Sequence, residues 1–434
     1  MQGATLMNKK YEIRDPVHGF IEIDSWERDI VDHYIFQRLR RIKQLAWTDM
    51  VYPGATHTRF EHSLGVMHIA TKMYDHIVDR NRDFLKNRLG YNDSGLDRDR
   101  EIVRLACLLH DIGHSPFSHA GEDLMEINPD TNKPYKHEDY SAAIVLHMFK
   151  SIIEEHPQNE NYRITVKEIS DLLSGNTDSN RRLLWRNIIT GQLDADRADY
   201  LLRDSYHLGA NYGNYDLKRL LVTLTVSEHP ETGTPLIAIE EGGLHVAEAL
   251  IMARYLMFTQ VYFHHTRRAY DHHIAEAMKN ILLSETQKQA FPPPTSKENI
   301  DAYLSWDDWR VLGLLSQGKG NEAGMILRHR QHHRCIHSTP EVPNEHDLDK
   351  ANEILRELSN LVGFVDEARK SWYNANEEDI MIAKRQGMQE HVFPLSSIST
   401  IVKGLVPVRQ RRIYVPVANK KTAEQILKKY LEGN

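Results

Sequence analysis

Residues 106–119 read ACLLHDIGHSPFSH, and this segment guides the interpretation of the whole chain. The apolar run before position 110 predicts a buried helix, which ends at Gly113. The end of this helix therefore presents His110, Asp111 and His114 together. Mixed imidazole and carboxylate ligands suit Fe, Mn, Zn, Ni or Co better than Ca or Mg alone. We expect a divalent transition metal here, with further ligands from elsewhere in the chain.

A second helix is predicted to supply one of these ligands. His62 lies in TRFEHSLGV (58–66), at the start of a segment with helical periodicity. Arg59 precedes it by three residues and would face the same pocket. His62 is therefore a candidate third ligand.

A third helix carries Asp196, within LDADRADYLLRDSYHL (193–208). Residues four apart share a helix face, and carboxylates on a partly apolar helix are costly to bury unless they are paired or bind a metal. The residues expected to line one pocket wall are Asp196, Arg197, Tyr200 and Asp204.

Composition excludes several classes of protein. The 434 residues contain 54 lysines and arginines against 61 aspartates and glutamates, which gives a formal charge of −7. This balance argues against wrapping of nucleic acid, so we expect no nucleic-acid partner. No apolar run is long enough for a membrane span. Only two cysteines and the absence of a signal pattern favour a cytoplasmic protein.

The sequence predicts a mainly α fold with small β-hairpins. Helical patterns occupy residues 30–46, 60–79, 100–111, 139–155, 181–206 and 243–284. Composition changes after residue 285, and the later patterns are helical over 347–375, β-rich over 401–417 and helical over 420–431. We expect a helical catalytic domain over residues 1–285 and an α+β region over residues 286–434, which serves as a lid or an oligomerisation element.

Longer motifs resemble one family closely. They are DPVHG (15–19), FQRLRRIKQL (36–45), YPGATHTRFEHSLGV (52–66), HDIGHSPFSH (110–119), HED (137–139) and DADRADYLLRDSYHLG (194–209). Together they resemble the HD-domain deoxynucleoside triphosphate triphosphohydrolases, which include bacterial dGTPase-like enzymes and the animal enzyme that joins a SAM domain to an HD domain. The resemblance covers about residues 11–275. Too few residues precede Asp15 for a SAM domain, so we expect none.

The resemblance implies an HD-domain helical bundle and metal-dependent hydrolysis of dNTPs to deoxynucleoside and tripolyphosphate, with Mg accompanying the nucleotide. It implies these metal ligands: His62, His110, Asp111 and Asp196. It implies these catalytic residues: His114, His119, Glu122 and His137. His119 would protonate the leaving oxygen. Glu122 would orient the His119 ring, although the family often has Asp at the position of Glu122.

The resemblance also implies a substrate site. Arg59 and Arg197 would hold phosphates, although the family often has Lys at the second position. The sugar and its surroundings would be contacted by Gln44, Leu45, Tyr200, Asp204 and Tyr270. Leu45 would crowd the 2′ carbon and so reject ribonucleotides.

An allosteric nucleotide site is the last implication. Asp32, Gln37 and Arg40 match positions that hold a guanine nucleotide between subunits of the family. If such an activator, (d)GTP or another dNTP, binds here, we expect a homodimer or a homotetramer. The arginines of this segment could equally form a surface charge run.

Two alternatives remain at this point. The chain could be another HD phosphohydrolase, acting on nucleoside monophosphates, cyclic nucleotides or alarmones. It could instead be a nucleotide-sensing defence module without catalysis, although a complete set of ligands and histidines argues against this.

Overall fold

The computed structural model describes residues 9–176, 180–370, 379–387 and 389–433 and confirms a mainly helical chain with small sheets. The N-terminal half contains α1 (Ser25–Asp32), α2 (Tyr34–Gln37), α3 (Arg59–Leu89), α4 (Asp93–Leu109), α5 (His137–Met148), α6 (Lys150–Glu154), α7 (Asn159–Tyr162), α8 (Val166–Ser174), α9 (Asn180–Ile189) and α10 (Ala195–Leu208). The later helices are α11 (Leu217–Val222), α12 (Leu244–Met257), α13 (His265–Thr286), α14 (Lys297–Leu304), α15 (Asp308–Ser316), α16 (Asn321–Arg328), α17 (Glu345–Leu358), α18 (Leu395–Ile398), α19 (Thr400–Gly404) and α20 (Lys420–Gly433).

The strands form four small sheets. Two are antiparallel hairpins: β1 (Tyr11–Asp15) with β2 (Gly19–Ile23), and β3 (Ile127–Asn128) with β4 (Lys133–Pro134). A four-stranded sheet has the order β10 (Gln389–Pro394), β9 (Met381–Gln386), β6 (Pro235–Glu240), β5 (Leu224–Glu228). A three-stranded sheet has the order β7 (Arg334–Ser338), β11 (Val408–Val415), β8 (Phe364–Lys370).

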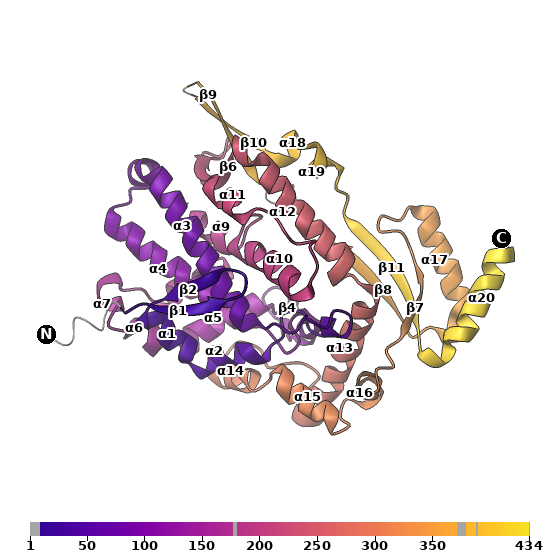
Figure 1. Ribbon diagram of the computed structural model, residues 1–434. Coiled ribbons are helices and arrows are strands. Elements are labelled where there is room, and N and C mark those ends of the chain that lie inside the picture. The colour runs from indigo at the N-terminus through magenta and orange to yellow at the C-terminus, as the bar shows by residue number, and fades with distance from the viewer. Residues whose placement is uncertain (1–8, 177–179, 371–378, 388, 434) are drawn as a thin grey trace.

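Helix α3 packs against both α4 and α10 (Figure 1). Helix α3 begins with a capping box, in which Glu61 reaches back to the backbone of Thr58. Gly65 allows α10 to approach closely, because a Cβ there would lie 2.0 Å from the Asp199 carboxylate. This close approach brings the polar face of α10 to the N-terminal turns of α3.

Five expected helices differ from the structure. Those expected over 139–155 and 181–206 are each divided in two, at Phe149 and over residues 190–194. The helix expected over 30–46 breaks at His33 and its last 3₁₀ turn ends at Arg41, because the next backbone is extended and Lys43 bridges to Thr58. The helix expected over 243–284 is interrupted by a π-helical turn at Phe258–Tyr262.

The fifth difference concerns the helix expected over 347–375. It ends at Leu358, where the chain enters a 3₁₀ turn and then strand β8, while residues 371–375 lie outside the described residues. The terminal helix and the β-rich segment are found as α20 and β11, although residues 400–404 are helical.

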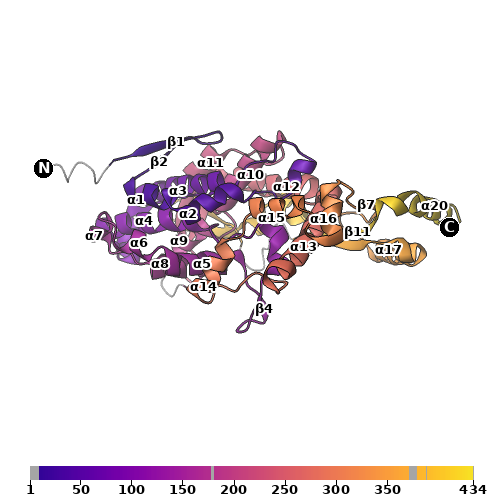
Figure 2. The same cartoon turned by 90° about the horizontal axis from the view of Figure 1, so that it is seen from below.

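The main hydrophobic core continues past residue 285. Tyr303, Trp306 and Leu395 belong to the same buried cluster as the residues of α3 and α4. Strand β9, which lies after residue 285, pairs in parallel with β6 and so extends the β5–β6 hairpin, which lies before it. A smaller core lies between α17, α20 and β11, at the edge of the molecule beyond α13 (Figures 1 and 2). Every helix in the described part of the chain is too short or too polar to span a lipid bilayer.

Candidate metal centre and active site

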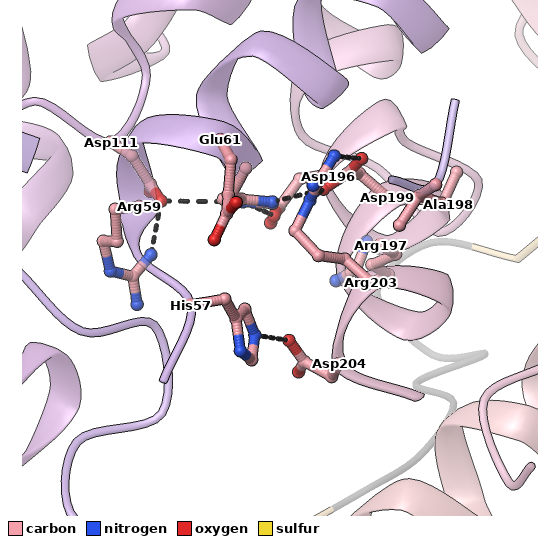
Figure 3. A network of polar contacts seen from close by, with 12 residues as sticks. His57, Arg59, Glu61, Asp111, Asp196, Arg197, Ala198, Asp199, Arg203 and Asp204 are labelled. Carbon is pink, nitrogen blue, oxygen red and sulfur yellow. Dashed lines mark hydrogen bonds and ion pairs between the residues drawn. The ribbon is translucent and has the colours of Figure 1, made fainter. Parts of the chain in front are cut away.

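Four side chains from the ends of three helices lie close together. Figure 3 labels two of them, Asp111 and Asp196. His62 Nε2 on α3 lies 3.0 Å from Asp196 Oδ1 on α10 and 3.6 Å from Asp111 Oδ2. His110 Nε2, at the end of α4, lies 3.3 Å from Asp111 Oδ1 and 3.9 Å from Asp196 Oδ1. The structure therefore brings together the four side chains that the sequence predicts as metal ligands.

The chemistry of this cluster fits a divalent transition metal. The Nε2 atoms of His62 and His110 are buried, and among the described residues neither makes a hydrogen bond of good geometry. Each histidine uses Nδ1 elsewhere: His62 donates to Asp199 at 2.8 Å, and His110 donates to the Cys107 carbonyl at 2.7 Å. Both Nε2 lone pairs are therefore free to coordinate a cation beside two carboxylates.

The electrostatics of the cluster also favour a cation. Burial opposes protonation of His62, but the close carboxylates of Asp196, Asp199 and Asp111 outweigh burial and raise its pKa to about 10. Burial likewise opposes ionisation of Asp111, yet Arg59 and the neighbouring histidines hold its pKa well below the usual range. The carboxylates that favour positive charge on His62 would equally favour a metal cation at its Nε2 in place of a proton.

A buried ion network behind His62 fixes its orientation. Asp199 accepts hydrogen bonds from His62, from His18 Nε2 at 2.6 Å, and from Arg203 Nε and Nη2 at 2.8 and 2.9 Å. Arg203 also donates to Asp15 at 2.7 Å. Sequence reasoning quoted the motifs that hold these residues without assigning them a role. The signal was the acidic spacing on α10, where Asp199 follows Asp196 by three residues.

The four predicted catalytic side chains form one group next to the metal cluster. Glu122 bridges two histidines: its Oε1 lies 2.6 Å from His137 Nδ1, and its Oε2 lies 3.0 Å from His119 Nδ1. The ring of His137 stacks on that of His114 at 3.8 Å, and His114 Nε2 lies 3.2 Å from Asp111 Oδ1. The group thus extends from Asp111 to the exposed ring of His119.

Charge is shared unequally within this group. Burial disfavours the ionised form of Glu122, but His119 and His137 hold its pKa below the usual range. Burial also opposes protonation of His137, yet Glu122 raises its pKa to about 9. Burial and the charge of Arg59 keep the pKa of His114 well below its usual value. The group therefore holds a protonated His137 beside a neutral His114.

A strained turn places His119. Phe117 and Ser118 are buried and have φ of 57° and 55°, in the left-handed region that is costly for residues other than glycine. Asp308, at the start of α15, accepts hydrogen bonds from the backbone N–H of Phe117 and of Lys43, each at 2.8 Å. One carboxylate from beyond residue 285 thus secures both the turn before His119 and the segment that leads to Gln44.

A cavity of about 1240 Å³ opens over these groups. Of the residues predicted to bind substrate, those that line it are Gln44, Leu45, Arg59, Arg197, Tyr200 and Asp204. Arg59 is paired with Asp111, and Arg197 Nη1 lies 2.6 Å from Asp194 Oδ2. The helix face predicted from Asp196 to Asp204 does form one wall.

Asp204 is held by two residues that sequence reasoning missed. His57 Nε2 lies 2.8 Å from Asp204 Oδ1, and Tyr262 Oη donates to Oδ2 at 2.5 Å. The π-helical turn delivers Tyr262 to this position, because it adds a residue to the path between α12 and α13. A π-turn has no local sequence signature that periodicity would reveal.

Four predicted residues lie elsewhere. Tyr270 is fully buried against Trp47 and His332 and is not among the residues that line the cavity. The three residues of the predicted allosteric site contact their own neighbours: Asp32 pairs with Arg28, Gln37 donates to the Val31 carbonyl, and Arg40 donates to Gln37 and lies over Phe60. Arg38, which would belong to the alternative surface charge run, is buried.

Comparison with known proteins identifies two family models in this chain. The HD domain model matches residues 59–204, and the HD associated region model matches residues 215–432. The uncharacterized protein YwfO of Bacillus subtilis is 35% identical over 270 residues, which are 61% of this chain and 54% of that protein. A deoxynucleoside triphosphate triphosphohydrolase SAMHD1 homolog of Dictyostelium discoideum is 33% identical over 268 residues, 61% of this chain and 48% of that protein.

A solved structure extends the likeness to nearly the whole chain. A phosphohydrolase from Bacteroides thetaiotaomicron superposes with a TM-score of 0.70 and 26% identity, over 94% of this chain and all of that chain. The chain spans about half the length of the curated relatives it matches. The HD associated region model alone covers half of the residues, and the HD domain model covers the helices that carry the metal cluster. The chain belongs to the family of HD-domain proteins that carry an HD-associated region.

Proposed function

We propose that this protein is a metal-dependent hydrolase that converts dNTPs to deoxynucleosides and tripolyphosphate. The observation that carries the proposal is that His110, Asp111 and Asp196 line the same cavity as the catalytic group around Glu122, with His62 directly behind them. The triphosphohydrolase name of the Dictyostelium relative supports the choice of substrate.

The residues of the chain divide the reaction between them. When bound, a divalent cation at the cluster supplies Lewis-acid activation of the phosphoryl group and of the attacking water. Attack at the α-phosphorus breaks the bond to the 5′ oxygen, which leaves as a poor alkoxide unless it receives a proton. His119 is placed to give that proton, and Glu122 orients its ring through Nδ1.

The remaining groups bind substrate. Arg59 and Arg197 present guanidinium groups to the cavity and suit phosphate oxygens. Asp204, held by His57 and Tyr262, is placed to accept a hydrogen bond from the 3′-hydroxyl. Gln44 and Leu45 also line the cavity, and Leu45 would leave no room for a 2′-hydroxyl on the sugar.

Activation by a nucleotide bound near Asp32, Gln37 and Arg40, between subunits of a dimer or tetramer, is part of the proposal. The pairing of Arg40 with Gln37 on one exposed edge supports it, because both side chains could turn toward a guanine edge and its phosphates.

Product analysis tests the proposal. The protein is incubated with each of the four dNTPs, singly and mixed, with Mn²⁺ or Mg²⁺, and the products are separated by ion-exchange chromatography. Tripolyphosphate and deoxynucleoside in equal amounts are expected. Orthophosphate or pyrophosphate as the product would instead indicate another HD phosphohydrolase. The absence of turnover under every condition would refute the proposed activity and favour a nucleotide-binding module without catalysis. Turnover in mixtures only would support the activator site.

A further inference from the structure

Helix α12 brings a single arginine to the cavity. Arg254 is the only Asp, Glu, Lys or Arg between Glu248 and Arg267, in a stretch that is otherwise mostly apolar. It lies in the last turn of α12, which packs against α10, and its guanidinium lies 5.9 Å from the centre of the Phe258 ring. The side chain lines the same cavity as Arg197 and Tyr200.

Arg254 differs from the other arginines of this cavity in its partners. The others form ion pairs with carboxylates: Arg59 with Asp111, Arg197 with Asp194, Arg267 with Asp271, and Arg268 with Asp366. Among the described residues, no carboxylate lies within ion-pair distance of Arg254. Its Nη1 makes a long hydrogen bond of 3.5 Å to Gln192 Oε1, and its Nε is buried without a partner.

This guanidinium has no close counter-ion among the described residues. Burial lowers the pKa of Arg254, and the nearby positive charge of Arg197 lowers it further, although Tyr200 and the more distant carboxylates of Asp194 and Asp196 act in the opposite direction. A partly buried charge without a counter-ion is costly to the fold, so its retention beside a second arginine requires another explanation. An anion that enters the cavity would accept hydrogen bonds from the free donors and offset both penalties.

We propose that Arg254 and Arg197 together bind the polyphosphate tail of the substrate, the part beyond the phosphorus that is attacked. This inference rests on the proposed function. Arg197 directly follows the candidate metal ligand Asp196, and both Arg197 and Arg254 line the cavity into which Asp196 faces. Arg254 thereby favours a triphosphate over a monophosphate.

The test uses inorganic tripolyphosphate, pyrophosphate and orthophosphate as probes, with binding measured by isothermal titration calorimetry on the full-length protein. The variants are Arg254→Gln, Arg254→Lys and the control Arg219→Gln. Arg219 is exposed on α11 and donates to the Gly242 carbonyl, away from the cavity. Steady-state kinetics with a dNTP are measured for the same set.

We expect Arg254→Gln to weaken tripolyphosphate binding roughly tenfold or more, because charge-assisted hydrogen bonds are lost. Orthophosphate binding should change less, KM should rise more than kcat falls, and Arg254→Lys should recover part of the loss. Without phosphate, Arg254→Gln should keep or raise the thermal midpoint, since an uncompensated charge is removed. A lowered midpoint with unchanged tripolyphosphate binding would overturn the inference and leave Arg254 a structural residue.

These outcomes separate the inference from the proposed function. Tripolyphosphate binding that depends on Arg254, in a protein that hydrolyses no dNTP, would uphold the inference and refute the triphosphohydrolase activity. Hydrolysis of dNTPs to tripolyphosphate with unchanged KM in Arg254→Gln would do the reverse.

Discussion

Replacement of Asp199 by Asn tests whether the buried network behind His62 prepares the metal site. The substitution preserves shape but removes the negative charge and turns one oxygen into an N–H donor. Asp199 is completely buried and accepts four hydrogen bonds, two of them from Arg203, which is also completely buried. The new amide would face donors on these neighbours.

The expected cost has two parts. Removal of one partner of a buried ion pair costs roughly 3–5 kcal/mol. We expect about 3 kcal/mol, the lower end, because Arg203 keeps its ion pair with Asp15 at 2.7 Å. His62 also loses the acceptor that holds its Nδ1 hydrogen, so Nε2 is no longer fixed as a lone pair. Loss of such a partner lowers metal affinity by roughly 10–100-fold.

Urea denaturation of chelator-treated protein measures the first part, and Mn²⁺ titration calorimetry measures the second. Asp79→Asn is the matched control, because Asp79 is exposed on the same helix as His62, and its stability should change by no more than about 0.5 kcal/mol. If Asp199→Asn loses stability but binds Mn²⁺ as tightly as the wild type, the network supports the fold only. The reasoning about His62 would then be refuted.

Three further perturbations probe the groups around the cluster. Glu122→Gln should flatten the dependence of stability on pH: because His137 has a pKa raised from 6.5 to about 9, its ion pair stabilises the fold fully below pH 6.5 and is lost as pH rises through about 9. Urea midpoints at pH 6 and pH 9.5 measure this dependence for the variant and the wild type. The same difference between the two pH values in both proteins would contradict the prediction. Tyr262→Phe should lower the free energy of unfolding by about 1–2 kcal/mol and raise KM for dNTPs, because Asp204 loses a buried hydrogen-bond donor. Equal KM values for the variant and the wild type would show that the Tyr262–Asp204 hydrogen bond does not contribute to substrate binding. Asp308→Ala leaves two buried N–H groups unpaired, so we expect a loss of about 2–4 kcal/mol in thermal denaturation together with reduced kcat, and a native-like midpoint would show that water replaces the carboxylate.

Local patterns in the sequence predicted the parts of the site that lie on single helices. The helix end at His110 and the shared face from Asp196 to Asp204 follow from the period of 3.6 residues and from helix-stop signals. Periodicity made His62 a candidate ligand, but its meeting with these residues was implied only by the resemblance to a family, because periodicity within one helix does not determine which other helix packs against it. Gly65 shows the cause, since it sets the distance between α3 and α10 by lacking a side chain.

Other parts of the site depend on contacts over long separations. Asp308 lies 191 residues from Phe117, yet it secures the turn that precedes His119. Tyr262 reaches Asp204 only because a π-turn shifts the register of a segment that reads as one continuous helix. Neither residue has a local signal, which is why the expected boundary at residue 285 divides side chains that cooperate in the structure.

The acidity of the chain constrains the order of events at the site. The protein carries a net charge of −7, and the proposed substrate is strongly anionic, so affinity must come from local rather than overall charge. At the reacting end of the cavity, Asp111 and Asp196 would repel a phosphoryl group at close range. Arg59 cannot offset both, because it is already paired with Asp111. A cation held by Asp111 and Asp196 would remove this repulsion, and we expect it to be bound before the α-phosphate contacts the site. Arg254, which has no carboxylate within ion-pair distance among the described residues, is the proposed cationic contact for the polyphosphate tail and does not depend on that metal.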